Sequence, residues 1–143
     1  MLKGRYKRFC CAFTLVELMM VVTLIGLMAV FVVPNYTKAI SRSSERTANN
    51  NLAIIYAAQN LKKNSGGSYL AGANTAAINT NLSLGIVDPE IDYTCASATG
   101  AAFFCKATRK DGSFILGVSD TNATVCCCSA SCPLLAACAA ACP

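Results

Sequence analysis

The stretch FTLVELMMVVTLIGLMAVFVV, residues 13–33, decides how the N-terminal part of this chain folds. It carries a single charge, Glu17, and an α-helix of about 20 apolar residues spans the hydrocarbon core of a bilayer. Ten residues from Leu18 to Val33 are Leu, Ile, Val or Phe, and together they contribute about −3 to −6 kcal/mol to insertion. Glu17 lies near one end, so it costs less than the roughly 2.5–3.5 kcal/mol of a charge at the membrane centre. The stretch is therefore predicted to be a transmembrane helix.

The charges around this run predict its orientation. Residues 1–12 contain four basic side chains and no acidic one, and the rest of the chain is nearly neutral. Cytoplasmic flanks of membrane helices carry an excess of Lys and Arg, so the N-terminus is predicted to face the cytoplasm and the chain after Pro34 to lie outside. Three basic residues beyond the helix weaken that bias: Lys38, Arg42 and Arg46.

Two simpler interpretations compete. A secretory signal peptide has a shorter apolar region followed by a small-residue cleavage site, whereas this run is longer and ends in VVPNY. A plain signal anchor accounts for the apolar run and the basic flank. It leaves Glu17 unexplained, because a lone acid in a membrane helix usually marks a function.

The motif Phe-Thr-Leu-Val-Glu-Leu-Met at residues 13–19, followed by an apolar run and Pro34, resembles the N-terminus of type IV pilins and type II secretion pseudopilins. The resemblance implies an α+β, pilin-like fold in which one long N-terminal helix packs on a small three-stranded antiparallel sheet. It also implies a structural subunit that polymerises into a helical filament. The motif covers about a quarter of the chain, and it is highly specific after a basic leader.

The same resemblance assigns roles to individual residues. A prepilin peptidase is expected to cut between Ala12 and Phe13 and to methylate the new amino group of Phe13. Glu17 is expected to pair with that amino group on a neighbouring subunit and so to set the register of assembly. Gly26 and Pro34 match positions that bracket a stretch which loosens in filaments. The family usually has Gly before the cut, so Ala12 predicts slower processing.

The helix is predicted to continue as an amphipathic segment over residues 34–64, since proline can kink a long helix without ending it. Apolar residues recur at helical spacing on two faces, as expected for a helix between a sheet and a filament interior. A single wide face on a small core is the alternative. The first face holds Ala48, Leu52, Ile55 and Gln59, with Tyr56 beside it, and the second holds Ile54, Ala58 and Leu61.

The remainder divides into a loop and a sheet over residues 65–120 and a Cys-rich tail over 121–143. Residues 65–90 are rich in Ser, Gly, Asn and Thr and are predicted to be a loop. Three short β-prone runs follow at 91–97, 101–109 and 113–119, and Asp111-Gly112 predicts a hairpin between the last two.

Ten cysteines in an exported chain favour disulfides. Cys95 and Cys105 are equidistant from Gly100, so a hairpin turning there brings them face to face, and we favour a disulfide over two buried thiols. The tail cysteines are predicted to be disulfide-bonded, within the tail or to a neighbouring subunit, or to belong to a poorly ordered end. They are Cys126, Cys127, Cys128, Cys132, Cys138 and Cys142.

The composition excludes several chemistries. The chain has no histidine, which removes Ser/His and Cys/His nucleophile pairs and metal sites that contain histidine. We expect no enzyme activity, no metal and no cofactor. A basic patch at Lys106, Arg109 and Lys110 is read as a solvated edge, so no nucleic-acid partner is expected.

The expected partners follow from the resemblance. They are other pilins or pseudopilins, the prepilin peptidase, the inner-membrane assembly platform with its ATPase, and lipid before assembly. The precursor is expected in the bacterial cytoplasmic membrane, and the assembled filament in the periplasm or at the cell surface. The alternatives are a minor pilin or DNA-uptake pseudopilin that acts as a binding module, and a signal-anchored Cys-rich envelope protein of metal or redox function.

Overall fold

The computed structural model describes residues 13–97, 99–129, 132, 134 and 135. Contacts within the chain divide it into two units, Met1–Ala39 and Ile40–Pro143. Within the described residues, two helices are followed by four strands. The bounds are α1 Leu15–Asn64, α2 Thr75–Leu82, β1 Ile91–Ala96, β2 Phe104–Arg109, β3 Ile115–Ser119 and β4 Asn122–Cys127.

Helix α1 is a single 50-residue helix, which confirms the predicted long N-terminal helix. It continues through Pro34, although proline has no N–H to donate to the preceding turn. Lys62 and Lys63 occupy its last turn, where positive charge is favourable next to the exposed carbonyls. Gly66 then adopts a φ of 86°, a left-handed conformation that glycine tolerates and that ends the helix.

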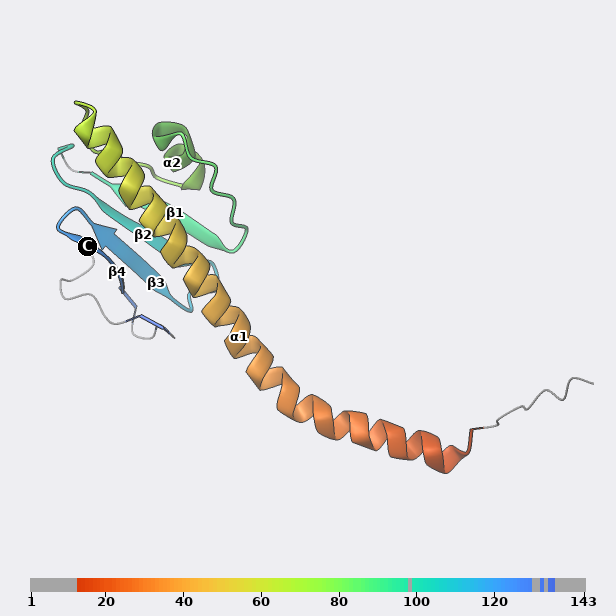
Figure 1. Ribbon diagram of the computed structural model, residues 1–143. Helices are drawn as coiled ribbons and strands as arrows, with labels where there is room; N and C mark the ends of the chain where they lie inside the picture. The colour runs from red at the N-terminus through yellow and green to blue at the C-terminus, as the bar shows by residue number, and fades with distance from the viewer. Residues whose placement is uncertain (1–12, 98, 130–131, 133, 136–143) are drawn as a thin grey trace, which may run out of the picture. The chain divides into compact units, whose positions relative to one another are not determined.

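Among the described side chains of α1, the buried face lies in the C-terminal half, in the second unit. The first predicted face is confirmed, because Ala48, Leu52, Ile55 and Gln59 are each 0 % exposed. The second predicted face is open within this single chain: Ile54 is 48 % exposed and Leu61 is 73 % exposed. Figure 1 shows this part of α1 lying across one face of the sheet.

The sheet has four antiparallel strands in the order β1-β2-β3-β4, so the predicted count of three was wrong. The additional strand, β4, lies in the segment assigned to the Cys-rich tail. Val125 and Cys127 are buried and Cys126 between them is half-buried, which is the alternation of a strand with one face on a core. Pairing with β4 also satisfies main-chain groups of β3 that an edge strand would leave open.

The segment predicted to be a loop over residues 65–90 contains a short helix, α2. Asn74 caps it, since its side chain accepts a hydrogen bond from the main-chain N–H of Ala77 at 2.8 Å. The helix buries Ile78, and the hydroxyl of Thr75 accepts a hydrogen bond from the N–H of Tyr93 in β1 at 3.1 Å. Helix α2 therefore packs beside β1, as Figure 1 shows.

The core of the second unit lies between α1 and the inward face of the sheet. Its largest fully buried side chains are Tyr93, Phe114, Leu52, Ile55 and Ile78. The buried amide of Gln59 fixes the chain that leaves α1: its Nε2 donates to the carbonyl of Leu70 at 2.6 Å, and its Oε1 accepts from the N–H of Leu70 at 2.9 Å. Because both polar ends are satisfied, this amide is buried at little cost.

Candidate functional site

The most unusual surface of the first unit is an apolar helix whose described side chains are exposed. Side chains along its length, from Phe13 to Val32, are 46–76 % exposed wherever a large hydrophobic residue is described. Helix α1 contains an 18-residue window of mean hydropathy 2.6 that is 0 % buried, and it is long and apolar enough to cross a membrane. Soluble chains rarely expose a contiguous apolar surface of this extent, so the surface is built to meet lipid or protein.

The first turn of α1 is polar and capped. The hydroxyl of Thr14 accepts a hydrogen bond from the N–H of Glu17 at 3.2 Å, and the carbonyl of Thr14 accepts one from Leu18 at 3.2 Å. Thr followed three residues later by Glu is the sequence signature of a capping box. This signal did not enter the prediction of the helix from the sequence. Glu17 also places negative charge at the positive end of the helix dipole.

The bond to Thr14 uses the main-chain N–H of Glu17 and not its side chain. It leaves the carboxylate on an exposed first turn, four residues after Phe13, which is itself 72 % exposed. Both groups are therefore accessible to another molecule. Ala12 lies outside the described residues, so cleavage between Ala12 and Phe13 stays a prediction.

The middle of the apolar run contains few polar groups, and its one hydroxyl is satisfied internally. The Oγ1 of Thr23 donates to the carbonyl of Met20 at 2.9 Å and lies 3.1 Å from that of Met19. Internal satisfaction of this kind is what a helix in lipid requires. A methyl group built on Gly26 would meet nothing within 4 Å. The proposed loosening between Gly26 and Pro34 stays a prediction.

The structure brings Cys95 and Cys105 together across β1 and β2, where they are paired in register and joined by a disulfide. A second disulfide joins Cys127 and Cys132. Cys126 and Cys128 are disulfide-bonded as well, so each cysteine in the described part of the chain is oxidised. None of these six sulfurs is then available as a thiolate ligand for a metal. Cys138 and Cys142 lie outside the described residues.

Two of the three basic residues predicted to form a patch, Arg109 and Lys110, are paired within the second unit. Arg109, whose side chain is 11 % exposed, lies 3.3 Å from the carboxylate oxygens of both Glu90 and Asp111. Its neighbour Lys110 lies 4.0 Å from Asp92 and donates to the carbonyl of Pro89 at 2.8 Å. Lys106 is exposed in β2. This pattern of paired charges does not favour a nucleic-acid surface.

Comparison with known proteins identifies the N-terminal segment. Residues 7–33 match the prokaryotic N-terminal methylation motif. A stretch of 47 residues is 47 % identical to a protein described as "Type IV major pilin protein PilA" from Myxococcus xanthus (strain DK1622). The aligned stretch covers 33 % of this chain and 21 % of that relative, about a fifth of its length.

Proposed function

We propose, from the premise that this chain carries a type IV pilin-type N-terminal segment, that it is a membrane-anchored subunit of a helical filament. The observation that carries the proposal is that the apolar half of α1 is exposed while the second unit has its own core. An apolar helix of this length has two stable environments, a lipid bilayer and the interior of a bundle of like helices. The subunit uses the first before assembly and the second afterwards.

Processing links the two environments. Removing residues 1–12 takes away the four basic side chains of the leader and leaves a new amino group on Phe13. Among the packed helices of a filament, a carboxylate without a partner is strongly unfavourable. The exposed Glu17 of one subunit therefore pairs with the amino group of Phe13 on its neighbour, and the pair sets the axial register.

The second unit of the subunit supports the same use. Ile54 and Leu61 form an exposed apolar row on α1, away from the face buried on the sheet. In a filament this row is a further contact surface, because burying it against a neighbour removes apolar area from water.

The name of the matched relative favours a type IV pilus, and a type II secretion pseudopilus is the alternative that experiment must separate from it. In either case a prepilin peptidase cleaves and methylates the precursor in the cytoplasmic membrane. An assembly platform and its ATPase then draw the subunit into a periplasmic or surface filament.

The proposal is tested by the mass of the chain taken from the cell envelope and by filament yield. We expect a chain that starts at Phe13 with one added methyl group. Glu17→Ala is expected to enter the membrane in normal amount but to give few filaments, whereas Glu90→Ala, in the second unit, gives normal filaments. Normal filaments from Glu17→Ala, or a chain that keeps residues 1–12, contradicts the proposal. Filaments sheared from the cell surface indicate a pilus. If a strain that assembles the subunit yields no sheared filaments, the result indicates a pseudopilus.

A further inference from the structure

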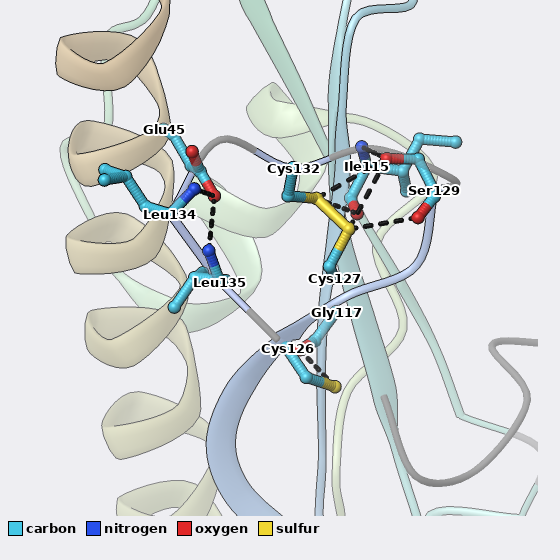
Figure 2. The surroundings of a disulfide bond; sticks show 9 residues. All are labelled: Glu45, Ile115, Gly117, Cys126, Cys127, Ser129, Cys132, Leu134 and Leu135. Atoms are coloured by element: carbon cyan, nitrogen blue, oxygen red, sulfur yellow. Dashed lines mark hydrogen bonds between the residues drawn. A yellow bond between two sulfur atoms is a disulfide. The ribbon is translucent and has the colours of Figure 1, made fainter. Parts of the chain in front are cut away.

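A glutamate is buried in α1 where the fold has no obvious need for charge. Glu45 is 0 % exposed, and glutamate is almost never fully buried unless it is paired. Its Oε1 accepts hydrogen bonds from two successive main-chain N–H groups, those of Leu134 at 3.2 Å and Leu135 at 3.1 Å. Its Oε2 has no hydrogen-bond partner within the described residues. Figure 2 shows the carboxylate of Glu45 facing these two amides.

The two amides come from a segment about 90 positions along the chain, directly after a disulfide ring. Cys127, the last residue of β4, is joined to Cys132, and the bond closes a sequence separation of 5. The Cα atoms of the two cysteines are 6.0 Å apart, whereas five residues of open chain span up to about 17 Å. The ring therefore confines Cys132, and with it Leu134 two residues later, to the neighbourhood of the strand end.

The ring is itself fixed to the sheet. The N–H of Cys128 donates to the carbonyl of Ile115 in β3 at 2.7 Å, and the N–H of Ile115 donates to the hydroxyl of Ser129 at 3.3 Å. The hydroxyl of Ser129 lies 3.5 Å from the Sγ of Cys132. Leu135 and Cys132 pack against the core as partly buried residues. Figure 2 shows Cys132 bonded to Cys127 near Ile115, with Leu134 and Leu135 on the side of Glu45.

We propose that Glu45 is a positioning residue that docks the segment at Leu134–Leu135 on α1, and that the Cys127–Cys132 disulfide is the redox-dependent latch that keeps this segment within its reach. Glu45 and the disulfide depend on each other. Without the disulfide the amides leave Glu45, and a buried carboxylate that has lost its donors is strongly disfavoured, so this part of α1 becomes hydrated. Without Glu45 the amides lose a charged acceptor, and the segment leaves α1 although the ring stays closed.

Closing the latch requires an oxidant of the disulfide-exchange class. The thiolate of one cysteine attacks a sulfur of the oxidant's disulfide, and one oxidant thiol leaves. The second cysteine then attacks the mixed disulfide, which forms the Cys127–Cys132 bond and releases the other oxidant thiol. Two electrons and two protons pass from the cysteine pair to the oxidant, whose disulfide becomes two thiols. The segment at Leu134–Leu135 is then held within reach of Glu45.

The test is amide hydrogen exchange on the full chain in detergent micelles, with disulfides mapped by peptide mass spectrometry. Glu45→Ala is expected to speed exchange at Leu134 and Leu135 by about tenfold or more, a factor that corresponds to 1.4 kcal/mol, with the ring still closed. The pair Cys127→Ser and Cys132→Ser is expected to speed the same amides with Glu45 intact. The triple variant combines Glu45→Ala with both cysteine substitutions. Its amides at Leu134 and Leu135 are expected to exchange no faster than in the more affected of the two simpler variants, because both changes break the same docked arrangement.

Control variants separate the loss of this docking from general unfolding. Glu45→Gln keeps an acceptor oxygen and is expected to give intermediate exchange, and Glu90→Gln, an exposed carboxylate elsewhere, is expected to leave Leu134 and Leu135 unchanged. The amides of Leu116 and Val118 in β3 report whether each variant is folded. Wild-type protection of Leu134 and Leu135 in Glu45→Ala overturns the docking role. The same protection in the double cysteine variant overturns the latch, and additive effects in the triple variant overturn their coupling.

Discussion

The hydroxyl of Tyr93 in β1 donates a hydrogen bond to Oδ2 of Asp88 at 3.3 Å, and this bond ties the strand to the turn that precedes it. Asn51 of α1 completes the arrangement, because its Nδ2 donates to the same hydroxyl at 2.8 Å. A helix, a turn and a strand thus meet at one phenolic oxygen. Tyr93 is 0 % exposed, so no part of this network is replaced by water without cost.

Removing the hydroxyl is expected to destabilise the second unit. Tyr93→Phe keeps the ring and its packing but leaves the amide of Asn51 and one oxygen of Asp88 without their partner, which costs about 1–3 kcal/mol. The measurement is urea unfolding of the full chain in detergent, followed by a signal from the second unit. Thr94→Ser, at the neighbouring position of β1, is the control. Equal midpoints for Tyr93→Phe and wild type contradict the prediction.

The same tyrosine predicts a loss of stability in alkali. Burial, with the negative charge of Asp88 in addition, raises the pKa of Tyr93 well above its ordinary value. A group whose pKa is raised on folding contributes its full stability below the unfolded pKa of about 10, and that contribution is lost as the pH rises toward the folded value. Wild type is therefore expected to lose stability more steeply than Tyr93→Phe from about pH 9 to pH 12. Parallel pH profiles for the two proteins would exclude this role of the tyrosine.

At Gln59, we expect the chemistry of the replacing side chain to affect stability more than its size does. Its Nε2 lies 2.6 Å from the carbonyl of Leu70, so Gln59→Glu replaces a donor by an acceptor in a fully buried site. A buried group left unsatisfied costs about 1–3 kcal/mol, and more when it is charged. We expect Gln59→Glu to be more destabilising than Gln59→Met. The control is Asn60→Ala, whose amide donates to the helical carbonyl of Tyr56 and is expected to matter less. Thermal unfolding of the four proteins ranks them, and a Glu variant as stable as wild type would refute the argument.

Two glycines predict opposite outcomes for the same change. A methyl group at Gly72 would lie 2.5 Å from Cγ1 and 3.1 Å from the main-chain N of Ile78 in α2, whereas one at Gly85 would meet nothing within 4 Å. Gly72→Ala therefore forces α2 away from β1 and is expected to cost about 1–3 kcal/mol. Gly85→Ala is expected to be neutral or slightly stabilising, because alanine restricts the unfolded chain. Equal unfolding midpoints for the two variants would show that the contact at Gly72 relaxes freely.

Strong periodic signals in the sequence predicted the parts of the fold that depend on them. The spacing of Ala48, Leu52 and Ile55 identified the buried face of α1, and the symmetry of Cys95 and Cys105 about Gly100 identified the register of the first hairpin. These signals are reliable because burial and pairing act on fixed periods of 3.6 and 2 residues. The apolar run of residues 13–33 is predicted from its length and composition instead.

The missed elements had weak or masked signals. Helix α2 buries one residue fully, Ile78, and its best signal was Asn74 as an N-cap rather than any apolar period. Strand β4 was hidden because its inward positions, Val125 and Cys127, lie among cysteines that suggested a low-complexity tail. The role of Glu45 had no sequence signal, since its partners are main-chain amides about 90 residues away. Contacts of that kind depend on the tertiary fold and not on side-chain identity.

Arg109 predicts that charge alone does not hold the end of the sheet. Its guanidinium lies 3.3 Å from both Glu90 and Asp111, and its Nη1 lies 3.4 Å from the hydroxyl of Ser41 in α1. Lysine keeps the charge but has one nitrogen, which cannot reach partners on three sides. Because both carboxylates are more than half exposed, solvent screens the pairs, and we expect Arg109→Lys to cost about 1 kcal/mol.

Urea unfolding at low and high salt checks this expectation. The lysine variant lacks the forked geometry of the guanidinium at either ionic strength. Its difference in stability from wild type is therefore expected to shrink with salt without disappearing. Lys106→Ala, an exposed position in the same strand, is the control and is expected to change stability by less than about 0.5 kcal/mol. If Arg109→Lys matches wild type at low salt, the planar fork of the guanidinium is unnecessary, and Arg109 serves as a simple surface charge.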